Sequence, residues 1–325
     1  MLDRIKNALN STVDTINFPQ ALAQHSGKVR EGFSLPADKR AIVVTDRISA
    51  FDFILGTVPF KGQVLNQITA WWFKKLDGVV PHHMIAMPDP NIAVVKSAKV
   101  LPVEIIVRGY LTGTTKTSSW YSYQHLNREI CGLTMPEGMK NNEKFPSPIV
   151  TPTTKPTAAG EHDEAISREE IIEQGLVTAE MYAQAEQYAL KMFALGQKVA
   201  AERGLILVDT KYEMGIDVNG NLMVIDEVHT PDSSRYWIAD TYDERMAEGV
   251  TPDALSKEFV RESIVAKGYD VNDLSVNPAK FMSDDVRIEV AQKYIELYQI
   301  MTGEDFILPE EGSATERIEK VLSGL

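Results

Sequence analysis

The residues best suited to chemistry lie in one stretch, from Gly204 to Trp237. Two apolar, β-prone runs in this stretch flank Asn219-Gly220, and such a pair is the strongest short-range signal for a β-hairpin. Loops of two or four residues centred on that pair give the same register, in which Glu213 lies directly opposite Asp226. A one-residue bulge would shift this register. The sequence therefore predicts a hairpin on which two carboxylates face each other.

The facing carboxylates indicate a metal site. Two carboxylates placed opposite each other in a hairpin repel, and a bound cation removes that repulsion. Mg²⁺ is commonly held by one or two carboxylates together with substrate phosphates. Because side chains alternate along a strand, Lys211 shares one face with Glu213 and Asp226. The charged residues that accompany them are Asp209, Asp232 and Arg235. We predict a metal and phosphate site here; the alternative is a solvated hairpin face whose charges pair with one another.

Two other segments suit phosphate binding. The segment 27–32 begins and ends with glycine and carries Lys28 and Arg30, which is typical of a turn whose backbone can approach phosphates. It lacks the Gly-Lys-Ser/Thr of a Walker A loop, so a basic turn is the alternative. Further on, the apolar run 103–107 leads into Arg108 and a turn of glycines and threonines. Such a turn offers N–H groups and hydroxyls beside a bidentate guanidinium.

Two polar segments are expected to border the site. The apolar strand 41–45 leads into a turn with charged and hydroxyl side chains, and such groups at the end of a buried strand often belong to a site. The alternative is a turn held by local hydrogen bonds. The segment 146–164 is rich in proline and threonine, which forbids regular structure, and Lys155 within it could line the site.

Composition limits the class of protein. The 325 residues suffice for one large domain or two to three smaller ones, and 44% hydrophobic with 24% charged residues is ordinary for a globular protein. A net charge of −13 argues against a nucleic-acid surface. The single cysteine, Cys131, excludes an intramolecular disulfide, and no apolar run approaches the roughly 18 residues of a membrane span. With no signal-like start, we expect a cytoplasmic protein that does not bind membranes.

Hydrophobic periodicity predicts further elements. Strands are expected on both sides of 96–99, with a domain boundary at Pro102. A capping box at Ser167 starts a short helix. Longer helices are predicted over residues 64–76, 118–126, 178–203, 251–268, 283–302 and 313–322. His82 and His83 have no partner at metal-ligand spacing, so we interpret them as structural or surface residues.

Six segments together resemble one known family. In order, they read GKVREG, TDRISAFD, EIIVRGYLTGT, TPTTK with GEHDEAIS, LVDTKYEMG and IDEVHTPDSSRYW. Over roughly residues 18–240 the chain is similar to SAICAR synthetase, the phosphoribosylaminoimidazole-succinocarboxamide synthase of purine biosynthesis. Its helical tail resembles the longer, yeast-like form. The departures are PFKGQ at 59–63, Glu31-Gly32, and Thr114 in place of a frequent serine.

The resemblance implies an ATP- and Mg²⁺-dependent ligase. It would join carboxyaminoimidazole ribonucleotide (CAIR) to L-aspartate, giving SAICAR, ADP and phosphate. The implied fold class is α/β (α+β), with two lobes related to kinase and ATP-grasp folds. We expect an antiparallel N-terminal ATP-binding lobe (1–101), a larger α/β catalytic domain (102–245) and a helical C-terminal region on the core (246–325).

The resemblance also implies roles for individual residues. Catalysis is assigned to Lys211, Asp209 and Asp232, and the metal to Glu213 and Asp226. ATP binding is assigned to Gly27, Lys28, Arg30, Val100 and Leu101. Binding of the ribonucleotide phosphate is assigned to Arg108, Thr114 and Arg235. Arg47, Ser49 and Asp52 are assigned to substrate binding elsewhere in the site.

Two other functions remain open. A small-molecule kinase could use the same fold, since Asp-x-Lys-x also occurs in inositol phosphate kinases, but it would leave phosphate on its product. A non-catalytic nucleotide-binding module would not need opposed carboxylates, a lysine and two phosphate-binding arginines together.

Overall fold

The N-terminal third of the chain forms an antiparallel sheet. The computed structural model describes all residues except 52, 156–162, 272, 274–275 and 310–312. Five strands pair in the order β1-β2-β3-β7-β6, and every pairing is antiparallel. They are β1 Ala23–Ser26, β2 Arg30–Leu35, β3 Lys39–Val44, β6 Met84–Asp89 and β7 Ile92–Lys96. A short separate ribbon, β4 Arg47–Ala50 with β5 Phe53–Thr57, follows β3.

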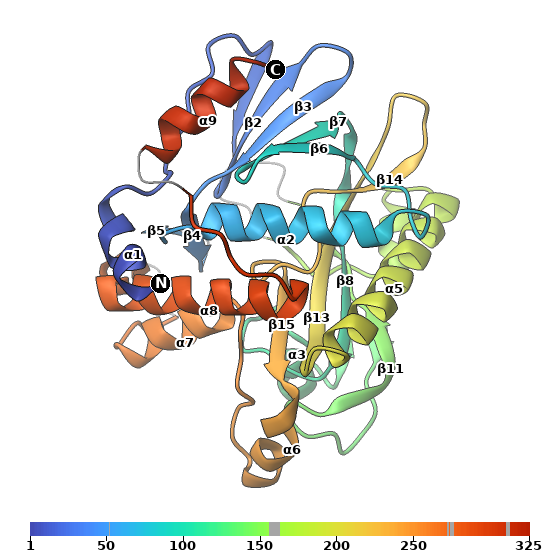
Figure 1. Cartoon of the computed structure of the whole chain (residues 1–325). Coiled ribbons are helices and arrows are strands. Elements are labelled where there is room, and N and C mark those ends of the chain that lie inside the picture. Colours follow the sequence, from blue (N-terminus) through green and yellow to red (C-terminus); the bar gives the residue numbers. More distant parts are fainter. Residues whose placement is uncertain (52, 156–162, 272, 274–275, 310–312) are drawn as a thin grey trace.

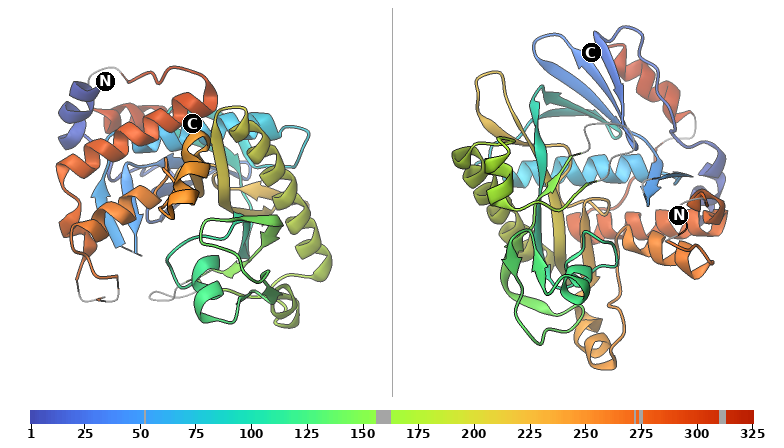
Figure 2. Two further views of the ribbon diagram at one scale, coloured as in Figure 1. Left: turned by 90° about the horizontal axis from the view of Figure 1, so that it is seen from below. Right: turned by 180° about the vertical axis from the view of Figure 1, so that it is seen from behind.

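A second antiparallel sheet carries the predicted hairpin. Its central strands are β8 Lys99–Tyr110 and β13 Leu205–Ile216, which pair along most of their length. Around them lie β11 Lys144–Val150, β12 Thr153–Thr154, β14 Leu222–Ile225 and β15 Ser234–Ile238. The two-residue strands β9 Glu129–Ile130 and β10 Leu133–Thr134 form a small hairpin apart from it. The long helix α5 Ala179–Ala201 runs along this sheet and buries its apolar side against it (Figures 1 and 2).

Most predicted helices are present. The helices other than α5 are α1 Leu2–Asn7, α2 Lys61–Leu76, α3 Ser119–His125, α4 Arg168–Glu173, α6 Ala239–Glu248, α7 Glu258–Ala266, α8 Asp284–Thr302 and α9 Ala314–Leu322, with 3-10 turns η1 Ala8–Asn10 and η2 Pro278–Phe281. The capping box at Ser167 is confirmed: its side chain accepts from the Glu170 N–H, and the Glu170 side chain returns to the Ser167 N–H. The predicted α/β (α+β) fold class is confirmed.

One predicted helix begins later than expected, and two short helices were not predicted. The helix expected over 251–268 begins only at Glu258, because the preceding segment bonds to the end of β15: the Leu255 N–H donates to Tyr236 O and the Ile238 N–H to Asp253 O. Helices α1 and α6 were not predicted; both are short, and none of the residues of α6 is buried.

The C-terminal helices α8 and α9 pack against the N-terminal part of the chain. Helix α8 packs against α2 and α1, and α2 crosses between α8 and the first sheet (Figure 1). Ile318 and Leu322 of α9 pack with Phe33 of the first sheet. Pro102, where we expect a domain boundary, lies inside β8, and the division into 1–101, 102–245 and 246–325 stays a prediction. None of the helices formed by the described residues is long and apolar enough to span a membrane.

Candidate active site

The predicted register of the hairpin is wrong by one residue. Glu213 pairs with Ile225 rather than Asp226, and Ile216 pairs with Leu222, which leaves residues 217–221 as the loop. The Asp217 carboxylate explains the longer loop, because it accepts the N–H groups of Asn219 and Asn221 at 2.9 and 2.8 Å. Strict alternation would therefore place Glu213 and Asp226 on opposite faces.

A left-handed residue brings the two carboxylates together again. Asp226 follows the last residue of β14 and has φ 64°, so the strand's alternation ends there. Glu213 and Asp226 consequently line one cavity of about 330 Å³. Burial raises the pKa of Asp226 to about 6, and the nearby Glu213 adds to this while Arg30 opposes it.

The cavity gathers most of the predicted nucleotide-binding residues. It is lined by Gly27, Lys28, Arg30, Val100, Lys155, Glu213 and Asp226, together with His83. Arg30 reaches across it from β2 to Asp226 Oδ1 at 3.1 Å and Glu227 Oε1 at 2.7 Å. The side chain of Leu101, in contrast, is buried in the main hydrophobic core. His83, interpreted as structural or surface from the sequence, is buried at the cavity wall.

A second carboxylate faces Glu213 from the neighbouring strand. Glu104 of β8 lies directly across from Glu213, and Lys211 bridges them, with Nζ at 2.6 Å from Glu104 Oε1 and 3.2 Å from Glu213 Oε1. Lys155 also pairs with Glu213. Burial alone would raise the pKa of Glu213, but Lys211 and Lys155 outweigh it and lower the pKa to about 2. Glu104 was not predicted as a site residue, although an acidic residue in a β-branched run was a usable signal.

A second group of cations lies further along β13. Arg108 of β8 and Arg235 of β15 both approach Asp209 Oδ2, at 3.7 and 3.1 Å. Arg108 also donates to Thr151 Oγ1 and Thr117 O, so its orientation is fixed. The turn of glycines and threonines lies beside them, because a Cβ on Gly113 would be 3.5 Å from Arg235 Nη1. Thr114 of that turn is exposed.

Asp232 belongs to a third, buried cluster. Its Oδ2 accepts from Lys61 Nζ at 2.9 Å and lies 3.7 Å from Lys257 Nζ, while its Oδ1 accepts from the Tyr294 hydroxyl at 2.7 Å. Burial opposes ionisation of Asp232, but Lys257 and Lys61 outweigh it and hold its pKa well below the usual range. Neither lysine was predicted from the sequence as a site residue, because 171 residues separate Lys61 from Asp232.

The segment predicted as a turn after β3 instead forms β4, and it supports the site rather than lining the cavity. The buried guanidinium of Arg47 donates to the carbonyls of Gly27 and Lys28 and to Glu31 Oε1, so it braces the turn between β1 and β2. Ser49 Oγ accepts from Lys257 Nζ at 3.3 Å. Asp52 lies outside the described residues.

The carboxylates at the cavity fit Mg²⁺ only if phosphate oxygens of a bound ligand complete its coordination. Among the described residues, no three side chains of the His, Cys, Asp and Glu types lie close enough together to hold a metal. Two carboxylates plus phosphate oxygens is nevertheless a common Mg²⁺ environment. Glu213 and Asp226 line a cavity that also carries the basic side chains expected around phosphates. These residues therefore fit a metal that arrives bound to a polyphosphate.

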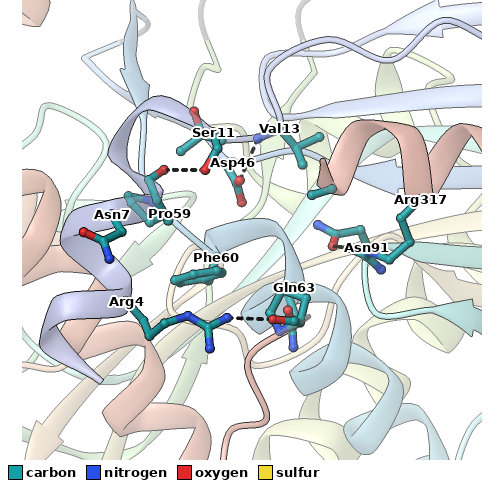
Figure 3. Close-up of a pocket in the computed structure, with 14 residues that line it drawn as sticks. Arg4, Asn7, Ser11, Val13, Asp46, Pro59, Phe60, Gln63, Asn91 and Arg317 are labelled. Carbon is teal, nitrogen blue, oxygen red and sulfur yellow. Dashed lines mark hydrogen bonds between the residues drawn. The ribbon is translucent and has the colours of Figure 1, made fainter. Parts of the chain in front are cut away.

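A larger cavity, of about 370 Å³, lies elsewhere (Figure 3). It is bordered by α1, the start of α2 and α9, and Asp46 in its wall accepts the N–H groups of Val13 and Gly62, each at 2.8 Å. None of the predicted site residues lines it, so it is not the candidate active site.

Comparisons with known proteins identify the family. The family model described as SAICAR synthetase matches residues 23–275. A phosphoribosylaminoimidazole-succinocarboxamide synthase of Bacteroides fragilis is 47% identical over 95% of this chain and 96% of its own length. A phosphoribosylaminoimidazole-succinocarboxamide synthase of Legionella pneumophila is 45% identical over 91% of this chain and 93% of its own length. The solved SAICAR synthase of Saccharomyces cerevisiae, complexed with SAICAR, is 31% identical, with TM-score 0.76 over 91% of this chain and 100% of that one. The chain belongs to the SAICAR synthetase family.

Proposed function

We propose that this chain is an ATP-dependent ligase that joins CAIR to L-aspartate, giving SAICAR, ADP and phosphate, in purine biosynthesis. Family membership and the high identity to named synthases support this reaction. One observation carries the assignment of residues: β13 supplies Glu213 to the cavity, Lys211 as its ion-pair partner, and Asp209 to the arginine pair. A single strand thus connects two places that suit anions.

The cavity between β2 and β14 is the proposed nucleotide site. The turn at Gly27 and Lys28, braced from behind by Arg47, suits the phosphates of ATP. Arg30 would neutralise phosphate charge from β2. Val100 is the side chain on the β8 side that suits the adenine ring, whereas the burial of Leu101 leaves it a supporting role.

Magnesium would be held by Glu213 and Asp226. When bound, it would neutralise the negative charge that develops on the transferring phosphoryl group. Before any ligand binds, Arg30, Lys155 and Lys211 balance these carboxylates. The same three cations would contact the phosphates and the reacting carboxylate once the metal takes the acidic side chains.

The arginine pair is the proposed site for the ribonucleotide phosphate. Arg108 and Arg235 share Asp209, and Arg235 also pairs with Glu258, which Arg261 contacts in turn. These three guanidinium groups face two carboxylates, so one positive charge remains for a phosphate. Thr114, exposed in the adjoining turn, could donate its hydroxyl.

The reaction itself requires an activated carboxylate. An oxygen of the CAIR carboxylate attacks the γ-phosphorus of ATP, ADP leaves, and an acyl phosphate forms. The amine of L-aspartate then attacks the acyl carbon, and phosphate leaves with that oxygen and its P–O bond intact. Positioning and charge neutralisation supply most of such catalysis. Lys211 lies where it can contact both the phosphate and the carboxylate, which otherwise repel.

One assay separates this proposal from a kinase. ADP release is measured with CAIR, in the presence and absence of L-aspartate, and the product is identified by mass spectrometry. We expect sustained ADP release and SAICAR only with both substrates. Equal ADP release without L-aspartate, with a stable phosphorylated product, would favour the kinase. We expect the reaction in the cytoplasm, with small molecules as the partners.

A further inference from the structure

The loop that joins β14 to β15 carries acidic side chains of the site, namely Asp226, Glu227 and Asp232. The paired register of β13 and β14 ends at Glu213 and Ile225, and beyond them this loop leaves the sheet. It returns to β13 where the Lys211 N–H donates to Ser233 O at 3.0 Å. The positions of its carboxylates therefore depend on what anchors the middle of the loop.

His229 anchors the middle of this loop. It is fully buried and has a left-handed backbone, with φ 54°. Its ring lies edge-on to Trp72 of α2, with the two ring centroids 4.5 Å apart. On the α5 side, a Cβ on Gly196 would be 2.5 Å from His229 Cε1, so only glycine leaves room for the ring there. The His229 carbonyl accepts from the Tyr236 hydroxyl of β15 at 2.9 Å. The residue thus fills a closely fitting slot between α2, α5 and β15.

One polar bond ties the His229 ring to β13. The Tyr212 hydroxyl and His229 Nε2 are 2.5 Å apart, and both side chains are fully buried. Burial lowers the pKa of His229 to about 3 and raises the pKa of Tyr212, so a protonated hydroxyl donates to a neutral ring. His229 Nδ1 has no hydrogen-bond partner among the described residues, so the bond to Tyr212 is the one that orients the imidazole.

Tyr212 lies on the reverse face of the strand that carries the site. Side chains alternate along β13, so Tyr212 points into the main hydrophobic core, whereas Lys211 and Glu213 lie on the opposite face. The bond to His229 consequently joins the back of the strand that bears Glu213 to the loop that begins with Asp226. Mg²⁺ demands nearly ideal octahedral geometry, so small changes in the separation of its carboxylates weaken its binding.

We propose that Tyr212 and His229 are positioning residues for the metal carboxylates. Their bond holds the Asp226 loop against the strand of Glu213, so that both carboxylates can bind one Mg²⁺. Neither Tyr212 nor His229 lines the cavity of about 330 Å³. This inference rests on the proposed function, because it needs the metal assigned to Glu213 and Asp226. The alternative is that the pair contributes only to core packing, in which case its loss would lower stability alone.

The test is Tyr212→Phe, which removes the hydroxyl and keeps the packed ring. Calorimetry measures the binding of Mg²⁺ to the complex of the enzyme with ADP, in parallel with ADP binding in the absence of metal. We expect the Kd for Mg²⁺ to rise about 10-fold, because groups that orient metal ligands typically contribute about 10- to 100-fold to metal affinity. The Kd for metal-free ADP and the KM for CAIR should stay unchanged.

Tyr298→Phe is the matched control. Tyr298 of α8 is another buried tyrosine, and its hydroxyl donates to Glu304 Oε2 at 3.3 Å, in the C-terminal region. Both variants lose one hydroxyl hydrogen bond and should lower the temperature of unfolding. Tyr212→Phe should weaken Mg²⁺ binding, whereas Tyr298→Phe should leave it unchanged.

A double-mutant cycle tests whether the two residues act through their bond. Asparagine at position 229 tolerates the left-handed backbone but is too short to accept from the Tyr212 hydroxyl. In the His229→Asn background, Tyr212→Phe should therefore weaken Mg²⁺ binding no further. If His229→Asn fails to fold, Tyr212→Phe and its control still decide the proposal.

The outcomes separate this inference from the proposed function. A wild-type enzyme without ADP release that depends on L-aspartate would contradict the ligase function, and normal Mg²⁺ binding in Asp226→Asn would contradict the metal assignment. With both confirmed, a folded Tyr212→Phe protein that binds Mg²⁺ like the wild type would overturn the positioning role alone. An equal loss of Mg²⁺ affinity in Tyr298→Phe, or additive losses in the double variant, would overturn it as well.

Discussion

Arg108 and Arg235 lie on the two strands that flank β13, and each is paired in register with Asp209. Both guanidinium groups reach the same oxygen, Asp209 Oδ2, at 3.7 and 3.1 Å. Asp209 therefore orients both arginines, and Glu258 is a second partner for Arg235 alone. Burial lowers the pKa of Arg108, and the neighbouring Arg235 adds to this while Asp209 opposes it. The pair is thus held together at some electrostatic cost, which a bound phosphate would relieve.

The first prediction concerns this pair. Arg235→Lys should raise the KM for CAIR by about 10- to 100-fold and leave the KM for ATP unchanged, because lysine cannot make a bidentate phosphate contact. Arg245→Lys, in the exposed ion pair with Asp253, is the control. A KM increase for ATP instead would mean that the two phosphate sites are assigned the wrong way round.

The second prediction concerns the metal residues. Asp226→Asn should lower kcat at ordinary Mg²⁺ by about 100-fold or more, since removing one preorganised electrostatic contact costs about 3 kcal/mol. The fold should survive, because asparagine tolerates the left-handed backbone of this position. Turnover is measured across a Mg²⁺ titration beside a thermal unfolding curve. Near-normal turnover in a folded Asn variant would rule out the assignment.

The third prediction concerns the path of one oxygen. CAIR labelled with ¹⁸O in its carboxylate should deliver one ¹⁸O into the released phosphate, because the carboxylate oxygen leaves bonded to phosphorus. Mass spectrometry of the phosphate reads this out, with L-aspartate required for turnover. Unlabelled phosphate would contradict the acyl phosphate.

The fourth prediction concerns stability and pH. Burial raises the pKa of Asp46 to about 6, although the Val13 and Gly62 N–H groups oppose this. The unfolded carboxyl has a pKa of about 3.9. Between these values the folded state binds more protons, so the contribution of Asp46 to stability falls as the pH rises from 4 to 6.

The measurement compares the wild type with Asp46→Asn, in which other titrating groups cancel. The difference in unfolding free energy, wild type minus variant, should fall by on the order of 3 kcal/mol between pH 4 and pH 7. Urea unfolding at several pH values provides it. Parallel pH profiles for the two proteins would show that Asp46 titrates normally.

Local patterns allowed correct prediction where neighbours in sequence decide the structure. Period-2 alternation placed Lys211 and Glu213 on one face of β13, and their ion pair at 3.2 Å confirms it. The same alternation predicted the wrong register for Asp226, because the Asp217 side chain stabilises a longer loop. Asp226 itself has a left-handed backbone, which returns its carboxylate to the side of Glu213. Motif resemblance identified the family and several residues that line the cavity of about 330 Å³, but it could not separate Val100 at the cavity wall from Leu101 in the core.

By itself the sequence determined the main helices and the charged face of β13, because these depend on periodicity, capping and turn residues, and the resemblance to a family supplied the α/β (α+β) fold class. Only the tertiary structure decided which charged groups, distant in sequence, form ion pairs. Lys61 reaches Asp232 across 171 residues, and Arg30 reaches Asp226 across 196. Arg47 braces the turn between β1 and β2 in the same way, since the packing of distant segments brings its guanidinium against the carbonyls of Gly27 and Lys28. No local pattern records such contacts, because burial and charge balance are set by the whole fold.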